Sequence, residues 1–209
     1  MTSCQPTRLG VLLSGSGRTL ENLSEHIAAG SLDASVAVVI ASRADAYGVV
    51  RARNLGLPVR VIERRSLAGG RFHDAITEAL LEAGVDLVCM AGFLSLWRIP
   101  PQFEGRVMNI HPALLPYFGG RGYYGSRVHQ AVLEAGCVES GCTVHFCDNA
   151  YDHGPIVLQR RVPVLLEDTP ETLAGRVFEQ ECIAYPEAIR LYGAGQLTVV
   201  GDTVEILSL

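Results

Sequence analysis

Two polar side chains that could take part in catalysis lie near each other at the end of a β-like run. Asn109 and His111 are separated by one residue and follow the apolar pair Val107 and Met108. Side chains two positions apart on a strand point to the same side of the sheet, so we expect both to face one cleft. There an amide could donate to a developing oxyanion, and an imidazole could act as acid or base near neutral pH. The same residues would also fit a structural histidine that caps a loop.

A carboxylate, Asp152, is the third candidate, and it lies in the polar turn at residues 151–155 between two apolar runs. Sequences such as Asp-His-Gly-Pro are common in turns for purely conformational reasons. Beside His111, however, this carboxylate would raise the pKa of the imidazole and select its tautomer. If the fold brings Asp152 beside Asn109 and His111, the three would form a reacting centre, and His145 would support it from the β-like run before the turn.

A glycine-rich loop, Ser14-Gly15-Ser16-Gly17-Arg18-Thr19, joins a strand-like run to a helix-like segment. Backbone N–H groups and the helix dipole at such a junction favour an anion such as phosphate. The loop is not a dinucleotide fingerprint, because Leu20 occupies the third glycine position, and no Gly-Lys-Ser/Thr follows as in a P-loop. An ordinary turn that needs glycine for a positive φ remains an equal alternative.

Nucleophilic and metal chemistry have little support in the sequence. No Gly-x-Ser-x-Gly elbow is present. None of the six cysteines forms a Cys-x-x-Cys pair, so we interpret Cys4, Cys89, Cys137, Cys142, Cys147 and Cys182 as reduced thiols and predict no metal.

Strand-like and helix-like segments alternate along most of the chain. This pattern predicts an α/β fold with a Rossmann-like, open, mostly parallel twisted sheet and helices on both faces. The expected strands of this part are Leu9–Leu13, Val36–Ile40, Val59–Ile62, Val85–Met90 and Val107–Ile110. The runs Thr143–Phe146 and Ile156–Val162 flank a polar turn and predict antiparallel additions towards the C-terminus.

The chain length suits one domain, because single cores commonly hold about 100–200 residues. No linker is long enough to divide the 209 residues. We expect residues 1–195 to form one domain and residues 196–209 to form a β-hairpin extension around Gly201-Asp202.

Composition limits the partners. Hydrophobic residues make up 48% of the chain and charged residues 19%, as in globular proteins. The net charge of −5 and the scattered basic residues give no face for a nucleic acid. No apolar run reaches the roughly 18 residues of a membrane span, and the polar start lacks a signal-peptide profile. We therefore expect a cytoplasmic protein that acts on small molecules.

Several of these motifs together resemble the glycinamide ribonucleotide formyltransferase family, whose members use 10-formyltetrahydrofolate. The resemblance runs from about Leu9 to Tyr192. It is carried by Ser14-Gly15-Ser16-Gly17, Ala44-Asp45-Ala46-Tyr47-Gly48, Ala91-Gly92-Phe93, Asn109-Ile110-His111-Pro112-Ala113-Leu114-Leu115-Pro116, Val144-His145-Phe146 and Asp152-His153-Gly154-Pro155.

The resemblance implies roles for particular residues. Asn109, His111 and Asp152 would be the catalytic residues of formyl transfer, without a metal. The folate would contact Leu94, Leu96, Trp97, His145 and Asp148. The amine-bearing substrate would contact Glu181, and its phosphate would contact Gly15, Ser16, Gly17 and Thr19.

Two departures from the family pattern leave the acceptor open. Arg18-Thr19 stands where relatives carry Ser/Thr-Asn, and the loop Tyr117–Ser126 replaces a short Pro-Gly loop. The acceptor is then glycinamide ribonucleotide of purine biosynthesis or a different small amine, such as an amino sugar nucleotide. A non-catalytic folate or nucleotide sensor is a further alternative, and both a monomer and a homodimer fit the sequence.

Overall fold

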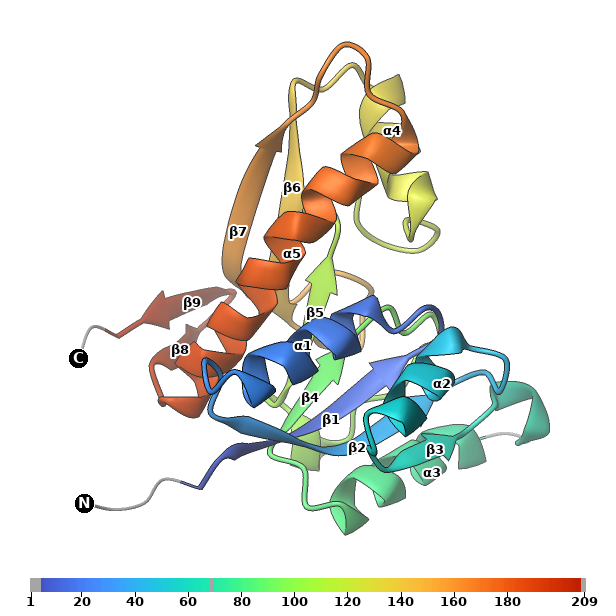
Figure 1. Ribbon diagram of the computed structural model, residues 1–209. Coiled ribbons are helices and arrows are strands. Elements are labelled where there is room, and N and C mark those ends of the chain that lie inside the picture. The colour runs from blue at the N-terminus through green and yellow to red at the C-terminus, as the bar shows by residue number, and fades with distance from the viewer. Residues whose placement is uncertain (1–4, 68–69, 208–209) are drawn as a thin grey trace. The chain divides into compact units, whose positions relative to one another are not determined.

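The computed structural model describes residues 5–67 and 70–207 of the chain. Cys4 lies outside these residues. The chain separates into two compact units, residues 1–107 and 108–209, which Figure 1 shows in blue to green and in green to red.

The first unit contains a parallel sheet with the strand order β3-β2-β1-β4. Its strands are β1 (Thr7–Leu13), β2 (Ala34–Ala41), β3 (Val59–Val61) and β4 (Leu87–Met90). Figure 1 shows β1 next to β2 and β4. The central strand is a continuous apolar run whose residues from Leu9 to Leu13 are buried, as expected for a strand covered on both faces.

Three α-helices connect these strands: α1 (Arg18–Ala28), α2 (Tyr47–Asn54) and α3 (Arg71–Glu82). Two 3-10 turns, η1 (Arg64–Ser66) and η2 (Pro101–Phe103), complete the described connections. Because parallel crossovers are right-handed, the reversal of strand order after β3 puts α3 on the opposite face from α1 and α2. Gly10 permits the close approach of α3, since a Cβ there would lie 2.5 Å from the Leu80 side chain.

The second unit contains a mixed sheet with the strand order β5-β6-β7-β9-β8. Its strands are β5 (Val107–His111), β6 (Glu139–Phe146), β7 (Ile156–Pro163), β8 (Leu197–Val200) and β9 (Thr203–Ile206). The pairs β5/β6, β6/β7 and β8/β9 are antiparallel, whereas β7/β9 is parallel. Two helices, α4 (Ser126–Glu134) and α5 (Pro170–Gly193), accompany it, and α5 runs along β6 and β7 (Figure 1).

Helix α5 begins with a capping motif, and it also holds β5 in place through a side-chain hydrogen bond. Thr169 and Thr172 form a reciprocal capping box, and Pro170 occupies the first turn. Further along, the buried Tyr185 hydroxyl donates to the carbonyl oxygen of Met108 at 2.9 Å. The backbone directly before Asn109 is therefore held by a side chain of the last helix.

The predicted fold class is confirmed, since parallel strands alternate with helices and antiparallel strands follow towards the C-terminus. Strand β6 begins at Glu139, four residues earlier than the sequence pattern predicts. The extra residues pair with β7, where Gly141 faces Arg161. A Cβ on Gly141 would lie 2.0 Å from the Arg160 carbonyl oxygen, so glycine, which weakens the sequence signal for a strand, is what permits the pairing.

Candidate active site

The register of β5 against β6 sets the positions of two candidate residues. Asn109 is paired with His145 and His111 with Thr143. Because directly paired residues point to the same face, the amide of Asn109 meets the imidazole of His145, with 3.1 Å between Nδ2 and Nε2. The pairing of the two strands thus brings Asn109 and His145 together within the second unit.

Asp152 joins the same cluster from the loop between β6 and β7. Its Oδ1 accepts from Asn109 Nδ2 at 3.3 Å, and its Oδ2 accepts from the backbone N–H of Gly120 at 2.8 Å. The Nδ1 atom of His111 lies 3.6 Å from Oδ2, and Nε2 of His145 lies 3.7 Å from Oδ1. The three residues predicted as a reacting centre are therefore neighbours in the structure.

The hydrogen-bond partners define the orientation of Asn109 and the tautomer of His145. A carboxylate only accepts, so the nitrogen of the Asn109 amide must face Asp152. His145 Nδ1 lies 2.8 Å from the Phe146 carbonyl oxygen and must donate to it. Nε2 of His145 then faces the Asn109 amide and holds it in place.

His111 uses one ring nitrogen on the backbone and leaves the other towards Asp152. Nε2 donates to the carbonyl oxygen of Phe118 at 2.8 Å. Burial lowers the pKa of His111, and the opposing effects of the Asp152 carboxylate and the Phe118 carbonyl do not restore it. The Asp152 carboxylate acts to raise this pKa, as expected, but desolvation of the ring outweighs the charge of its partner. The neutral ring presents the Nδ1 lone pair.

The Asp152 carboxylate stays ionised. Burial acts to raise its pKa, but the imidazoles of His145 and His111 and the Gly120 amide outweigh burial, and the pKa lies below its ordinary range. Only 12% of the Asp152 side chain is exposed. The cluster thus holds one largely dehydrated negative charge next to a basic nitrogen.

The glycine-rich loop that follows Pro116 contributes two backbone groups that the sequence analysis missed. Phe118, at φ 55°, supplies the carbonyl for His111, and Gly120 supplies the N–H for Asp152. A Cβ on Gly119 would lie 2.4 Å from the Leu115 side chain and 3.2 Å from Asp152 Cβ. The sequence analysis predicted only that this loop differs from the family pattern. Its consecutive glycines are the signal that the backbone approaches Leu115 and Asp152 closely.

The predicted phosphate loop lies in the first unit at the start of α1. Gly17 has φ 76° and precedes the helix without a side-chain cap. The loop is held from outside, because Gly48 N–H donates to the Gly15 carbonyl at 3.0 Å and Arg51 Nε donates to the Ser16 carbonyl at 3.0 Å. Arg51 also pairs with Glu21. The contacts from Gly48 and Arg51 thus fix the loop that precedes the N–H groups in the first turn of α1.

The residues predicted to line a folate pocket differ in exposure. Leu94 is 53% exposed and Leu96 is also exposed. The ring of Trp97 is 2% exposed, packs edge-on against Phe103 and donates from Nε1 to Thr77 at 3.3 Å. Trp97 is therefore part of the core of the first unit, and the leucines are the apolar surface of this segment.

The remaining predicted site residues lie in the second unit. Asp148 is exposed, whereas His145 is buried beside Asn109. Glu181 is half-buried on α5, and its charge adds to the effect of burial that raises the pKa of Cys142 to about 12. His129 lies on the inner face of α4 and is buried, with no hydrogen-bond partner for Nδ1.

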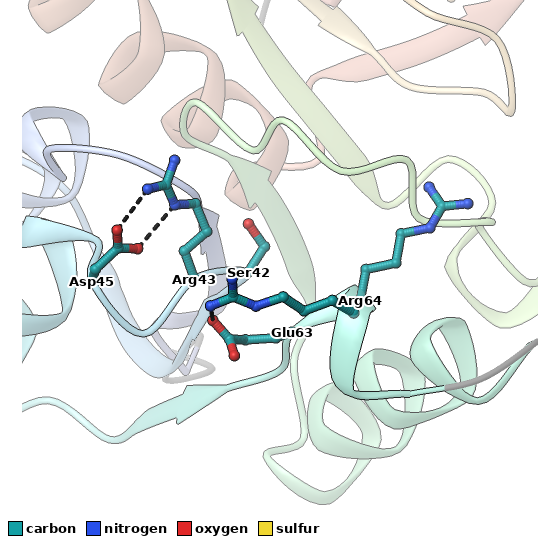
Figure 2. Close-up of a pocket in the computed structure, with 6 residues that line it drawn as sticks. Ser42, Arg43, Asp45, Glu63 and Arg64 are labelled. Carbon is teal, nitrogen blue, oxygen red and sulfur yellow. Dashed lines mark hydrogen bonds and ion pairs between the residues drawn. The ribbon is translucent and has the colours of Figure 1, made fainter.

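Figure 2 shows a cavity of about 270 Å³ in the first unit that no sequence motif predicts. It is lined by Ser42, Arg43, Asp45, Glu63, Arg64 and Arg65. Arg43 forms a two-pronged contact with Asp45, with distances of 2.9 and 2.6 Å, and Arg65 pairs with Glu63 at 3.2 Å. Two of the positive charges are thus already neutralised, one by the exposed carboxylate of Asp45 and one by the largely covered carboxylate of Glu63.

The described residues contain neither a metal-binding cluster nor a membrane-spanning helix. No group of three or more His, Cys, Asp or Glu residues in this part of the chain is arranged to hold a metal ion. Nor does any helix of residues 5–67 and 70–207 combine the length and apolar character that crossing a membrane requires.

Comparison with known proteins adds independent information. The formyl transferase family profile matches residues 7–189. The phosphoribosylglycinamide formyltransferase of Haemophilus influenzae is 37% identical over 91% of this chain and 89% of its own length. The chloroplastic phosphoribosylglycinamide formyltransferase of Arabidopsis thaliana is 40% identical, and this chain spans 66% of its length. Only 19% of the chicken trifunctional purine biosynthetic protein adenosine-3 is matched, at 39% identity over 92% of this chain.

Solved structures give the same result. The crystal structure of glycinamide ribonucleotide transformylase 1 from Symbiobacterium toebii has a TM-score of 0.90 and 42% identity, and covers 98% of this chain and 95% of that chain. Phosphoribosylglycinamide formyltransferase from Anaplasma phagocytophilum has a TM-score of 0.84 and 35% identity, with coverage of 97% and 95%.

Proposed function

Because the chain belongs to the formyl transferase family, we propose that it transfers a formyl group from 10-formyltetrahydrofolate to the primary amine of glycinamide ribonucleotide, in purine biosynthesis. The observation that carries this proposal is the buried cluster of Asn109, His111 and Asp152. Relatives named for this reaction, of which one has 89% of its length matched, support the choice of acceptor.

In the proposed reaction the amine nitrogen bonds to the formyl carbon, the bond from that carbon to the folate nitrogen breaks, and the amine proton passes to the released nitrogen. Negative charge develops on the formyl oxygen. Asn109 Nδ2 lies 3.3 Å from Asp152 Oδ1 and 3.1 Å from His145 Nε2. The longer contact, to Asp152, is the one that the amide gives up in order to donate to this oxygen.

His111 and Asp152 accept the proton that leaves the attacking amine. The ionised carboxylate accepts it from the attacking amine through water, and His111 Nδ1, 3.6 Å away, can take it up. The resulting imidazolium faces the same oxyanion, while Nε2 stays on the Phe118 carbonyl. The ring therefore acts through Nδ1 alone.

We assign the binding roles as follows. Gly15, Ser16, Gly17 and Thr19 hold the phosphate of the acceptor, supported by the uncapped start of α1 and the bracing of the loop by Arg51. The folate contacts the exposed Leu94 and Leu96, with Trp97 supporting that segment from within the core, and it contacts the region of His145 and Asp148. Glu181 contacts the amine-bearing substrate.

The alternative acceptor, a different small amine such as an amino sugar nucleotide, is favoured by Arg18-Thr19 and by the length of the loop from Tyr117 to Ser126. Arg121 in that loop could replace a phosphate contact. Both acceptors use the same chemistry at Asn109 and His111.

The test is transfer from 10-formyltetrahydrofolate to each acceptor, followed by mass spectrometry. A mass increase of one formyl group on glycinamide ribonucleotide is expected. Transfer only to the amino sugar nucleotide would replace the acceptor, and no transfer to any amine with folate binding intact would favour a sensor.

Three further assignments complete the proposal. Residues 1–195 are the formyltransferase domain and residues 196–209 a hairpin extension, supported by the end of the family match at residue 189. The protein acts in the cytoplasm as a monomer or homodimer on small molecules without a metal. The cysteines among the described residues are not joined in disulfides, as is usual in a reducing compartment.

A further inference from the structure

The loop that carries Asp152 is closed at its base by backbone contacts. The N–H of Phe146 donates to the carbonyl of Pro155 at 2.9 Å. Gly154 packs on the same strand end, where a Cβ would lie 2.0 Å from the Phe146 carbonyl oxygen. Residues 147–154 thus form a loop between β6 and β7 whose two ends are in direct backbone contact.

The backbone of Asp152 within this loop is in an unfavourable conformation. Its φ is 52°, in the left-handed region that a residue with a side chain adopts at a cost. Such a conformation persists only where neighbouring contacts hold it. A change of φ at this position would turn the carboxylate away from Asn109 and His111.

A second carboxylate bridges the loop from one end to the other. Asp148 Oδ1 accepts from the Ala150 N–H at 2.7 Å, and Asp148 Oδ2 lies 2.7 Å from Nδ1 of His153, the residue that follows Asp152. Both ends of the segment that contains Asp152 are therefore fastened to one side chain.

We propose that Asp148 and His153 are positioning residues whose ion pair holds the backbone of Asp152 in the left-handed conformation that aims its carboxylate at Asn109 and His111. The kinetic part of this proposal rests on the proposed function, whereas the structural part does not. It also gives Asp148 a role besides the folate contact.

The pair is open to solvent, so pH and salt should control it. His153 is 72% exposed, and hydrogen bonding to Asp148 and the charges of Asp148 and Asp202 raise its pKa. Burial acts to raise the pKa of Asp148, but hydrogen bonds from His153 and the Ala150 N–H, with the charge of His153, outweigh burial and lower this pKa. The pair is fully formed below the ordinary pKa of histidine and is lost as the pH rises through the raised pKa of His153. Added salt screens it.

The first experiment follows His111 by NMR titration without substrate, in Asp148→Ala, His153→Ala and Asp152→Asn. Since the Asp152 charge raises the pKa of His111 against the effect of burial, we expect all three variants to lower this pKa further, with Asp152→Asn setting the limit. Glu139→Ala removes an equally short exposed ion pair, which joins β6 to Arg161 on β7, and should leave the His111 pKa unchanged. An unchanged His111 pKa in Asp148→Ala and His153→Ala, beside a shifted one in Asp152→Asn, would overturn the proposal.

The second experiment separates positioning from folate contact by steady-state kinetics. Misplacing Asp152 should reduce kcat about tenfold in both Asp148→Ala and His153→Ala, and His153→Ala, which removes no assigned folate contact, should leave the folate KM little changed. In the parent, kcat should decline as the pH rises through the pKa of His153, and His153→Ala should remove this limb. A raised folate KM in Asp148→Ala, beside an unchanged kcat in His153→Ala, would instead leave Asp148 with the folate contact alone and overturn the positioning role. Circular dichroism checks that each variant folds.

Discussion

The buried cluster around Asp152 and the cavity beside Arg43 differ in how far their charged groups are exposed to water. Asp152 is 12% exposed and is surrounded by an amide, two imidazoles and a backbone N–H. Asp45 in the cavity is 67% exposed and already occupied by Arg43. Buried charge with fixed partners responds strongly to any change, while exposed ion pairs contribute little because water replaces them.

Removal of the Asn109 amide should give the largest effect on the buried cluster. Asn109→Ala deletes the donor that we assign to the oxyanion and the contact with His145, and loss of one such donor costs about 10²–10³-fold in kcat. The measurement is kcat for formyl transfer, with circular dichroism as the control for folding. Activity within a few-fold of the parent would contradict the role of Asn109.

Gly119→Ala should disturb the same cluster from the backbone. Its Cβ would meet Leu115 at 2.4 Å and Asp152 at 3.2 Å, so the loop must move and release the Gly120 contact. We expect a loss of about 1–3 kcal/mol in unfolding free energy, by denaturant titration, together with lower kcat. Gly175→Ala on α5, which meets nothing within 4 Å, is the control and should be at least as stable as the parent.

Acid should destabilise the second unit through its buried histidines. Burial lowers the pKa values of His111 and His129 below 6.5, so the unfolded chain binds more protons. Stability is therefore complete above that pH and falls as the pH drops through it. His129→Leu removes one of these groups, whose Nδ1 has no partner, and should flatten the dependence of the melting temperature on pH. An unchanged slope would contradict the assignment.

The smallest effect is expected in the cavity of Figure 2. Arg43→Ala removes an exposed guanidinium paired with Asp45, and we expect no resolvable change in kcat or in melting temperature. A clear loss of activity would show that the cavity takes part in the reaction and would remove the contrast between the two regions.

Side-chain spacing carried most of what the sequence predicted. The strands were found from their apolar runs, and the two-residue spacing of Asn109 and His111 put both side chains on one face. Asp152 could be joined to them only through the family resemblance, because no local pattern relates residues 43 positions apart.

The contributions of the backbone could not be predicted. The carbonyl of Phe118 and the N–H of Gly120 are present in every peptide unit, so their use depends on the path of the loop. The net direction of the His111 pKa shift could not be predicted for a related reason, since the burial that outweighs the Asp152 charge is a property of the packed chain. The same holds for His129, whose inward position on α4 depends on what covers the helix.

The contact between Tyr185 and Met108 bears on how the protein matures during synthesis. The hydroxyl that holds the carbonyl before Asn109 lies 77 residues further along the chain. A nascent chain that has emerged only as far as Asp152 contains every proposed reacting group but not this anchor. Competence for catalysis should therefore arise late in translation, once α5 has left the ribosome and docked on β5.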